Sequence, residues 1–478
     1  AKPANKAMNT PVVDFVRRYA QQRTTRMHMP GHKGRGPLGC EELDITEIAG
    51  ADELYEAEGI IAQSEANATQ LFSTARTYYS TEGSSQCIRA MLHLALQMRP
   101  AKAGRPVLLA ARNAHKALLY AAALLDFDIQ WLWPSPDAAG ALCTCPVEPE
   151  MLSSALDELS AEGRTPFGVY LTSPDYLGFV QDIAGLSAVC HAHGLPLLVD
   201  NAHGAYLHFL KDGSRHPIQL GADLCCDSAH KTLPVLTGGA YLHLGPSVQA
   251  DEAAVRNALA LFGSTSPSYL ILQSLDAANA VLADGFREKL DVCRWRLGML
   301  CRELDALRPG LALPLTGAHR EPLKLTLDAA ALGLSGQQLA QALRERGVEC
   351  EYADPRYVVL MPSAESSAAE FACLQTALHA ICGEAPAADV SVAADDPAAF
   401  AALAGALEAQ PRRFTIREAV LAPQEMIPAA EAVGRICAAP AVSCPPAIPI
   451  VVSGETVPPE ALPLFARYGI EKAAVVKE

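Results

Sequence analysis

The sequence predicts an α/β fold built around a mainly parallel sheet, accompanied by smaller α+β units. Short apolar runs typical of β-strands alternate with helical stretches from about Thr77 onward, and such alternation is typical of parallel sheets. The chain has 478 residues and is 50% hydrophobic, which is enough for roughly two or three packed domains.

The first elements follow in order along the chain. A polar N-terminal arm carries one amphipathic helix around residues 11–19, and the apolar residues of a second helix at 88–98 share one face. The runs with β-strand composition lie at 106–110, 168–172, 196–199 and 222–226.

A second unit is expected after the turn-rich residues 262–269. Its pattern predicts one long helical stretch at 275–307, a helix at 336–346, and strands at 323–327 and 357–361. The Ala-rich residues 385–399 are typical of a linker. We therefore expect an N-terminal arm and linker (1–60), a large domain (61–275), a small α+β domain (276–385) and a C-terminal α+β domain (395–478).

Composition excludes several classes of function. A net charge of −15 argues against binding to nucleic acid or to an anionic membrane. No stretch reaches the roughly 20 apolar residues of a membrane span, and no signal-peptide core is found, so we expect a cytoplasmic protein. The 14 cysteines are scattered without CxxC spacing, which favours reduced thiols over disulfides or a metal site.

The most informative segment runs from 223 to 241, where an apolar run leads into a turn that presents Ser228, His230 and Lys231 together. A lysine in low-polarity surroundings beside other cations can form an imine with the aldehyde of pyridoxal phosphate (PLP). Ser228 and His230 are placed to hold the phosphate. Taken alone, Lys231 fits a solvated loop lysine better, so its partners decide the interpretation.

The first partner is Asp200, at the C-terminal end of an apolar run where parallel sheets bind ligands. An ionised carboxylate there would keep the pyridine nitrogen of PLP protonated, and the alternative is a helix N-cap. The turn 80–85 before the helix at 88 predicts a phosphate site, although a plain capping turn looks similar. His115 follows another strand run and could stack on the cofactor ring, or simply start a helix.

These residues, in this order, resemble the Orn/Lys/Arg decarboxylases, which belong to PLP fold type I, the aspartate-aminotransferase-like superfamily. The resemblance covers nearly the whole chain, and SAHKTLP with its neighbours is highly specific. The matching motifs are MPGHKG (29–34), RNAHK (112–116), TSPDYLGFVQDI (172–183), DNAHGAYLHF (200–209), SAHKTLPVLTGGAYL (228–242), STSPSYLILQSLD (264–276), AVGRICA (432–438) and CPPAIPIVVSGE (444–455).

The resemblance implies a PLP-dependent carboxy-lyase that acts on a basic amino acid in polyamine biosynthesis. It implies that Lys231 forms the Schiff base, that Asp200 faces the pyridinium nitrogen, and that Lys231 or His203 returns a proton to Cα. It also implies that His115 lies on the ring and that Ala202, His203, Ser228 and His230 lie beside it. Gly83, Ser84 and Ser85 are implied at the phosphate, and Thr265 and Ser266 at the phosphate of the neighbouring subunit. Thr172 is a further implied cofactor contact, and Ser173 is an implied residue of the pocket.

The resemblance also implies a homodimer or a dimer of dimers with shared active sites, in a short form that lacks the N-terminal response-regulator-like domain of longer relatives. Three positions depart from the family pattern. Asn201 stands where we expect the second acid of an Asp-Glu pair, and Cys444 and Ala447 replace the usual Tyr and Gly. These changes leave the cofactor residues intact and put the identity of the substrate in doubt.

Two rival functions stay open at this point. Another fold-type I reaction, transamination or elimination, would use the same cofactor residues, and a transaminase would clamp the substrate carboxylate with an arginine such as Arg76, Arg112 or Arg356. A PLP-binding paralogue without catalysis is the other rival. For the decarboxylase, arginine or lysine is favoured and ornithine is possible. The candidate residues for binding the distal cation are Glu82, Glu351 and Asp354.

Overall fold

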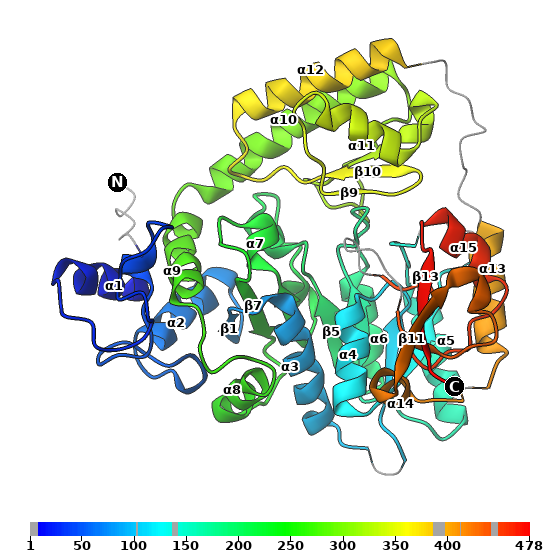
Figure 1. Cartoon of the computed structure of the whole chain (residues 1–478), viewed down its shortest axis with the longest axis horizontal. Coiled ribbons are helices and arrows are strands. Elements are labelled where there is room, and N and C mark those ends of the chain that lie inside the picture. Colours follow the sequence, from blue (N-terminus) through cyan, green and yellow to red (C-terminus); the bar gives the residue numbers. More distant parts are fainter. Residues whose placement is uncertain (1–7, 102–103, 136–141, 386–396, 412, 441–447) are drawn as a thin grey trace. The chain divides into compact units, whose positions relative to one another are not determined.

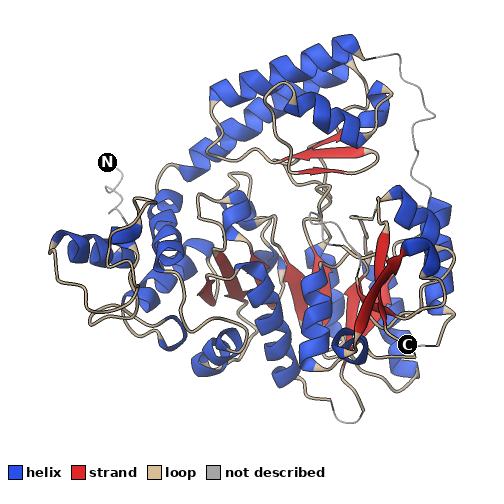
Figure 2. Ribbon diagram, in the orientation of Figure 1, coloured by secondary structure: helices blue, strands red, loops and turns tan. Residues whose placement is uncertain are grey.

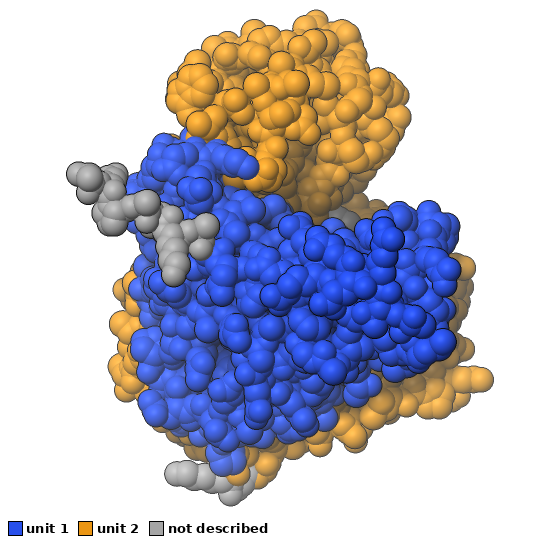
Figure 3. All heavy atoms as spheres, turned by 90° about the vertical axis from the view of Figure 1, so that its left-hand side faces the viewer, with its two compact units in different colours: residues 1–100, 196–291 blue, residues 101–195, 292–478 orange. Residues whose placement is uncertain are grey.

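The computed structural model describes residues 8–101, 104–135, 142–385, 397–411, 413–440 and 448–478 (Figures 1 and 2). The chain divides into two compact units, and each unit is made of two stretches of sequence. Unit 1 contains residues 1–100 and 196–291, and unit 2 contains residues 101–195 and 292–478 (Figure 3). The expected division into four consecutive segments stays a prediction.

Among its described residues, unit 1 has four strands, in the order β1-β7-β6-β5. Strands β5 and β6 are parallel, whereas β7 is antiparallel to both β6 and β1. Its elements are α1 (Pro11–Gln21), α2 (Ile60–Phe72), β1 (Arg76–Ser80), α3 (Gly83–Met98), β5 (Leu197–Asp200), β6 (Leu224–Asp227), α7 (Ala229–Thr232), β7 (Ala240–Leu244), α8 (Glu252–Ala260) and α9 (Tyr269–Ala283), followed by α10 (Phe286–Leu307), which continues into unit 2.

Unit 2 begins with three parallel strands in the order β4-β2-β3. Two antiparallel three-stranded sheets follow, β8-β10-β9 and β11-β13-β12. The elements are β2 (Val107–Ala111), α4 (Lys116–Leu125), β3 (Asp128–Leu132), α5 (Pro149–Ala161), β4 (Val169–Thr172), α6 (Ile183–Ala192), β8 (Leu325–Asp328), α11 (Gly336–Arg344), β9 (Tyr352–Ala353), β10 (Tyr357–Leu360), α12 (Ala368–Glu384), α13 (Pro397–Glu408), α14 (Ile416–Leu421), β11 (Gln424–Pro428), β12 (Cys437–Ala439), α15 (Ala461–Arg467) and β13 (Lys472–Val476).

The predicted α/β class is confirmed, and the expected strand runs coincide with β2, β4, β5, β6, β8 and β10 within two residues at each end. The single helical stretch expected at 275–307 is wrong. Two helices, α9 and α10, are separated at Asp284 and Gly285, where Gly285 has a φ of +76° that ends the helical geometry. Among the described helices, none has the length and apolar character needed to cross a bilayer.

A buried carboxylate holds the N-terminal helix in unit 1. Pro11 starts α1 and has no N–H, and Thr10 makes no side-chain cap. Instead, Asp276 Oδ2 accepts hydrogen bonds from the N–H groups of Val12 and Val13, both at 2.9 Å, while Ser64 donates to its Oδ1 at 2.6 Å. Asp276 is completely buried, so α9 provides the cap that the local sequence of α1 lacks.

This carboxyl group predicts a pH dependence of stability. Burial raises the pKa of Asp276 to about 6, above its unfolded value of 3.8. Its neutral form therefore contributes stability that is complete below pH 3.8 and is lost as the pH rises through about 6. Asp276→Asn keeps an acceptor without the charge, so its Tm relative to the wild type should rise between pH 5 and pH 8 in thermal unfolding. The exposed Asp157→Asn serves as control, and a constant difference for Asp276→Asn would contradict this account.

Candidate active site

The candidate site begins at the C-terminal ends of the parallel strands β5 and β6. Asp200 ends β5 and is 3% exposed, with Oδ1 accepting from Ala202 N at 3.1 Å and lying 3.7 Å from Cys226 Sγ. The next helical turn starts at Gly204 as N-cap, so Asp200 is not a helix cap. Strand pairing aligns Asp200 with Cys226, which brings the residues after β6 to the same edge.

Lys231 lies in the short helix α7, immediately after β6. Its Nζ atom is 3.2 Å from Nε2 of His203, and its backbone N–H donates to Ser228 O at 3.1 Å. His203 is only 5% exposed and Lys231 is partly buried. The structure therefore joins two of the three predicted catalytic residues and does not fit the alternative of a solvated loop lysine.

The predicted phosphate residues also meet. Ser228 Oγ donates to Ser84 Oγ at 2.8 Å, which links the end of β6 to the start of α3. The N-cap residue of α3, Glu82, makes no side-chain cap bond to the first turn of the helix. Gly83 has a φ of +71° and donates to Gly238 O at 2.8 Å. A Cβ on Gly238 would lie 2.9 Å from Thr81 O, so this turn requires glycine there.

The loop predicted to serve a neighbouring subunit is exposed. Thr265 and Ser266 both face solvent in unit 1, and Ser266 N donates to Ser264 Oγ at 3.1 Å. Ser264 N in turn donates to Glu82 Oε1 at 2.9 Å. This bond ties the loop to the turn before α3 and gives Glu82 a partner other than substrate.

Three predicted residues belong to unit 2 and follow the C-terminal ends of its strands. His115, after β2, accepts from Ala117 N at 3.1 Å through Nδ1 and so caps α4. Thr172 ends β4, and its buried hydroxyl has no hydrogen-bond partner among the described residues. Ser173 Oγ accepts from Gln181 N at 3.1 Å. The predicted stacking of His115 on the cofactor stays a prediction.

Several candidate substrate readers are engaged elsewhere. The carboxylate of Asp354 accepts from the N–H groups of Arg356 and Tyr357 and from the Tyr352 hydroxyl, at 2.6–2.9 Å, so it fixes a local turn. Glu351 accepts from Tyr176 at 3.1 Å. Each of the three candidate arginines for the carboxylate clamp of a transaminase forms an ion pair: Arg76 with Glu252, Arg112 with Glu455 and Arg356 with Asp328.

Sequence reasoning missed a buried polar cluster beside the site. Asp227, the last residue of β6, and the histidines His216 and His243 have fully buried side chains. Burial alone would raise the pKa of Asp227, but the two histidines outweigh it and hold that pKa below its usual value. Polar residues inside strands whose every position is buried, such as His243 in β7, were the signal available.

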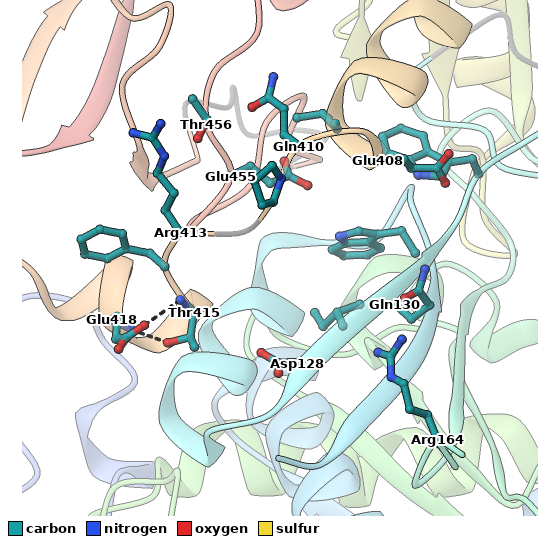
Figure 4. A pocket seen from close by; sticks show the side chains of 16 residues that line it. Asp128, Gln130, Arg164, Glu408, Gln410, Arg413, Thr415, Glu418, Glu455 and Thr456 are labelled. Atoms are coloured by element: carbon teal, nitrogen blue, oxygen red, sulfur yellow. Dashed lines mark hydrogen bonds between the residues drawn. The ribbon is translucent and has the colours of Figure 1, made fainter. Parts of the chain in front are cut away.

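A separate cavity of about 460 Å³ lies in unit 2 (Figure 4). It is lined by Asp128 and Gln130 of β3, by the end of α13 and the start of α14, and by Glu455. None of the predicted cofactor residues lines this cavity, so it is not the predicted PLP site.

Glu455, one of the residues that line this cavity, belongs to a buried ion pair. Glu455 accepts two bonds of 2.9 Å from Arg112, and both side chains are under 10% exposed. The guanidinium of Arg112 also lies 4.8 Å and 4.6 Å from the ring centres of Trp131 and Trp133. Glu455→Ala would leave this cation buried without its anion and should lower the free energy of unfolding by about 3–5 kcal/mol in urea titrations.

The exposed pair of Arg164 and Glu162 provides the control for that loss. These side chains are 41% and 60% exposed, so Arg164→Ala should cost less than about 1 kcal/mol. Equal losses for the two variants would show that burial does not decide the contribution of the Arg112 pair.

Comparison with known proteins identifies the family. Residues 10–293 match the family model described as the major domain of Orn/Lys/Arg decarboxylases. The Bacillus subtilis protein YaaO is 31% identical over 374 residues, 74% of each chain. A B. subtilis arginine decarboxylase is 27% identical over 471 residues, which cover 94% of this chain and 92% of the relative.

Solved structures agree on the fold. The constitutive lysine decarboxylase of Escherichia coli superposes with a TM-score of 0.74 at 19% identity, covering 98% of this chain and 80% of that chain. Mouse CSAD gives a TM-score of 0.53 at 18% identity, covering 70% and 79%. The predicted fold, PLP fold type I, is therefore confirmed. The match to the family model covers more than half of the residues of this chain. This chain therefore belongs to the Orn/Lys/Arg decarboxylase family and is an amino-acid carboxy-lyase.

Proposed function

We propose that this protein uses PLP held by Lys231 to decarboxylate a basic L-amino acid, arginine or lysine in preference to ornithine, in polyamine biosynthesis. The observation that carries the proposal is the 3.2 Å contact between Lys231 Nζ and His203 Nε2, beside Asp200 at the end of β5. Relatives named arginine decarboxylase align with 94% of the chain, whereas the E. coli lysine decarboxylase aligns with 55% at 24% identity, so we test arginine first.

The residues present fit PLP. Anion-binding groups gather at one place, where the Ser84 and Ser228 hydroxyls meet at 2.8 Å in front of an α3 N-terminus without a side-chain cap. Open space surrounds the position of a Cβ on Gly83, which leaves room for an anion against the backbone. The carboxylate, the lysine amine and these donors are the set of groups that the ring nitrogen, the aldehyde and the phosphate of PLP require.

Each residue would have a distinct task. Bound PLP supplies an electron-poor ring that accepts the electron pair left on Cα when CO₂ departs. Asp200 would hold a proton on the ring nitrogen, and Ser84 and Ser228 would bind the phosphate. Lys231 would anchor the cofactor through its Nζ atom. Lys231 or His203, in hydrogen-bond contact, would deliver to Cα the proton that replaces the carboxylate.

The assembly and location follow from the same proposal. We infer a cytoplasmic homodimer or dimer of dimers, in which Thr265 and Ser266 reach the phosphate site of the neighbouring subunit. Their exposure in the single chain supports this inference, because these hydroxyls are accessible to a second copy.

A substrate assay tests the proposal. PLP-loaded protein is incubated separately with arginine, lysine and ornithine, and CO₂ and the amine product are measured together. We expect equal amounts of CO₂ and amine from one preferred substrate. Formation of a keto acid without CO₂ would favour a transaminase. If PLP is bound but none of the three amino acids yields a product, a non-catalytic paralogue would be favoured.

A further inference from the structure

The buried cluster around Asp227 in unit 1 connects the two loops that carry the candidate cofactor residues. Asp227 Oδ1 accepts from Asn201 Nδ2 at 2.7 Å, and Oδ2 lies 3.0 Å from Nε2 of both His216 and His243. Asn201 and Asp227 are both 0% exposed. The carboxylate is thus surrounded by three nitrogen donors in a site without water access.

The hydrogen bonds of the two histidines account for this cluster as a hydrogen-bond network that requires no bound metal. His216 Nδ1 accepts from the backbone N–H of Ile218, so its proton lies on Nε2 and points to Asp227. His243 Nδ1 is 2.8 Å from the hydroxyl of Thr77, which can donate to it and leave Nε2–H for Asp227. In these tautomers both rings donate Nε2–H to Oδ2, and burial lowers the pKa of His243, which favours its neutral form.

The position of Asp227 in the chain links the network to both ends of the candidate site. Asn201 follows Asp200, and its backbone N–H also donates to Cys226 O at 2.9 Å. Asp227 directly precedes Ser228, whose hydroxyl meets Ser84. A shift of the Asp227 carboxylate would therefore displace the ring end and the phosphate end of the candidate site together.

We propose that Asp227 is a positioning residue for PLP, and that Asn201 is its matched partner. The proposal rests on the proposed function. It also accounts for the departure at position 201, because an acid there would face Asp227 inside a fully buried site, where two like charges repel strongly. An amide instead donates to the carboxylate, so this chain carries the negative charge at 227 and the donor at 201.

An exchange of the two residues provides a sharp test. Asn201→Asp places two carboxylates in contact. In the double variant Asn201→Asp/Asp227→Asn, the amide oxygen at 227 can accept from both histidines, as Oδ2 does, while its NH₂ group donates to the new carboxylate. The double variant therefore again pairs one carboxylate with one amide, and the carboxylate now stands at position 201. The second substitution should rescue the effect of the first.

The readout is the dissociation constant of PLP for the apoprotein, titrated by the absorbance of the lysine-bound cofactor. We expect Asn201→Asp to weaken PLP binding at least about tenfold. The double variant should bind within about threefold of the wild type. Leu304→Ala, a buried core change in unit 2, is the control: it should lower the Tm and leave PLP affinity unchanged.

The outcomes decide whether the pairing of Asn201 with Asp227 acts on PLP binding. Unchanged PLP affinity in Asn201→Asp, or an affinity in the double variant as low as in the single one, overturns the proposal. If Asn201→Asp does not fold, recovery of folded, PLP-binding protein in the double variant supports the pairing, and failure of both overturns it. A wild type that binds no PLP would instead contradict the proposed function itself.

Discussion

Replacing Lys231 by alanine is expected to abolish the absorption band of lysine-bound PLP and to lower turnover by roughly four orders of magnitude or more. The reason is that, in the proposed function, Lys231 supplies the amine that bonds the aldehyde of PLP, and its Nζ contacts His203, the other candidate proton donor. The measurement combines an absorbance spectrum of the PLP-loaded protein with the CO₂ assay.

Lys211 offers the matched control for this variant. It is an exposed lysine of unit 1 that forms an ion pair with Asp291 at 3.3 Å. Lys211→Ala should retain both the absorption band and the turnover. Normal turnover in Lys231→Ala would reject the assignment of the anchoring lysine, whatever the behaviour of the control.

The second large effect concerns Asp200. Asp200→Asn keeps the acceptor for Ala202 N and removes the charge that would hold a proton on the pyridine nitrogen. We expect kcat to fall by roughly 10²–10³-fold while PLP stays bound, because without this carboxylate the ring nitrogen would lose the proton that makes the ring electron-poor. Steady-state kinetics with the preferred amino acid measure this effect.

Asp182 distinguishes charge from capping. It accepts from Gly185 N at 3.0 Å as the N-cap of α6, the role that was the alternative for Asp200. Asp182→Asn should change stability by about 1 kcal/mol or less and leave kcat unaltered. An Asp200→Asn enzyme with wild-type kcat would reduce Asp200 to a similar structural role.

The sequence predicted those parts of the site that local patterns specify. Parallel strands place their C-terminal ends at one edge, so an acid that closes β5 and a lysine just after β6 had to lie near each other. The contact between His203 and Lys231 and the contact of Ser84 with Ser228 follow from this rule and from the turn at Gly83.

Long-range pairings escaped prediction because no local pattern encodes them. In the antiparallel pair of strands β1 and β7, Ser80 lies opposite Ala240. The composition of the sequence predicted neither of these two strands. The histidines that bind Asp227 are 11 and 16 residues away from it along the chain, and only the fold brings them together. Asp354 was a candidate for substrate binding because burial and turn formation are invisible in a linear sequence.

The packing of Arg112 gives this protein a built-in optical probe. The chain has three tryptophans, and two of them, Trp131 and Trp133, contact the guanidinium of Arg112. This guanidinium forms its ion pair with Glu455, which lies in the C-terminal part of the sequence. Trp295 is 64% exposed and contributes a background that is already solvent-like. Intrinsic fluorescence will therefore report the release of the C-terminal segment as a red shift from two indoles, without any label attached to the enzyme.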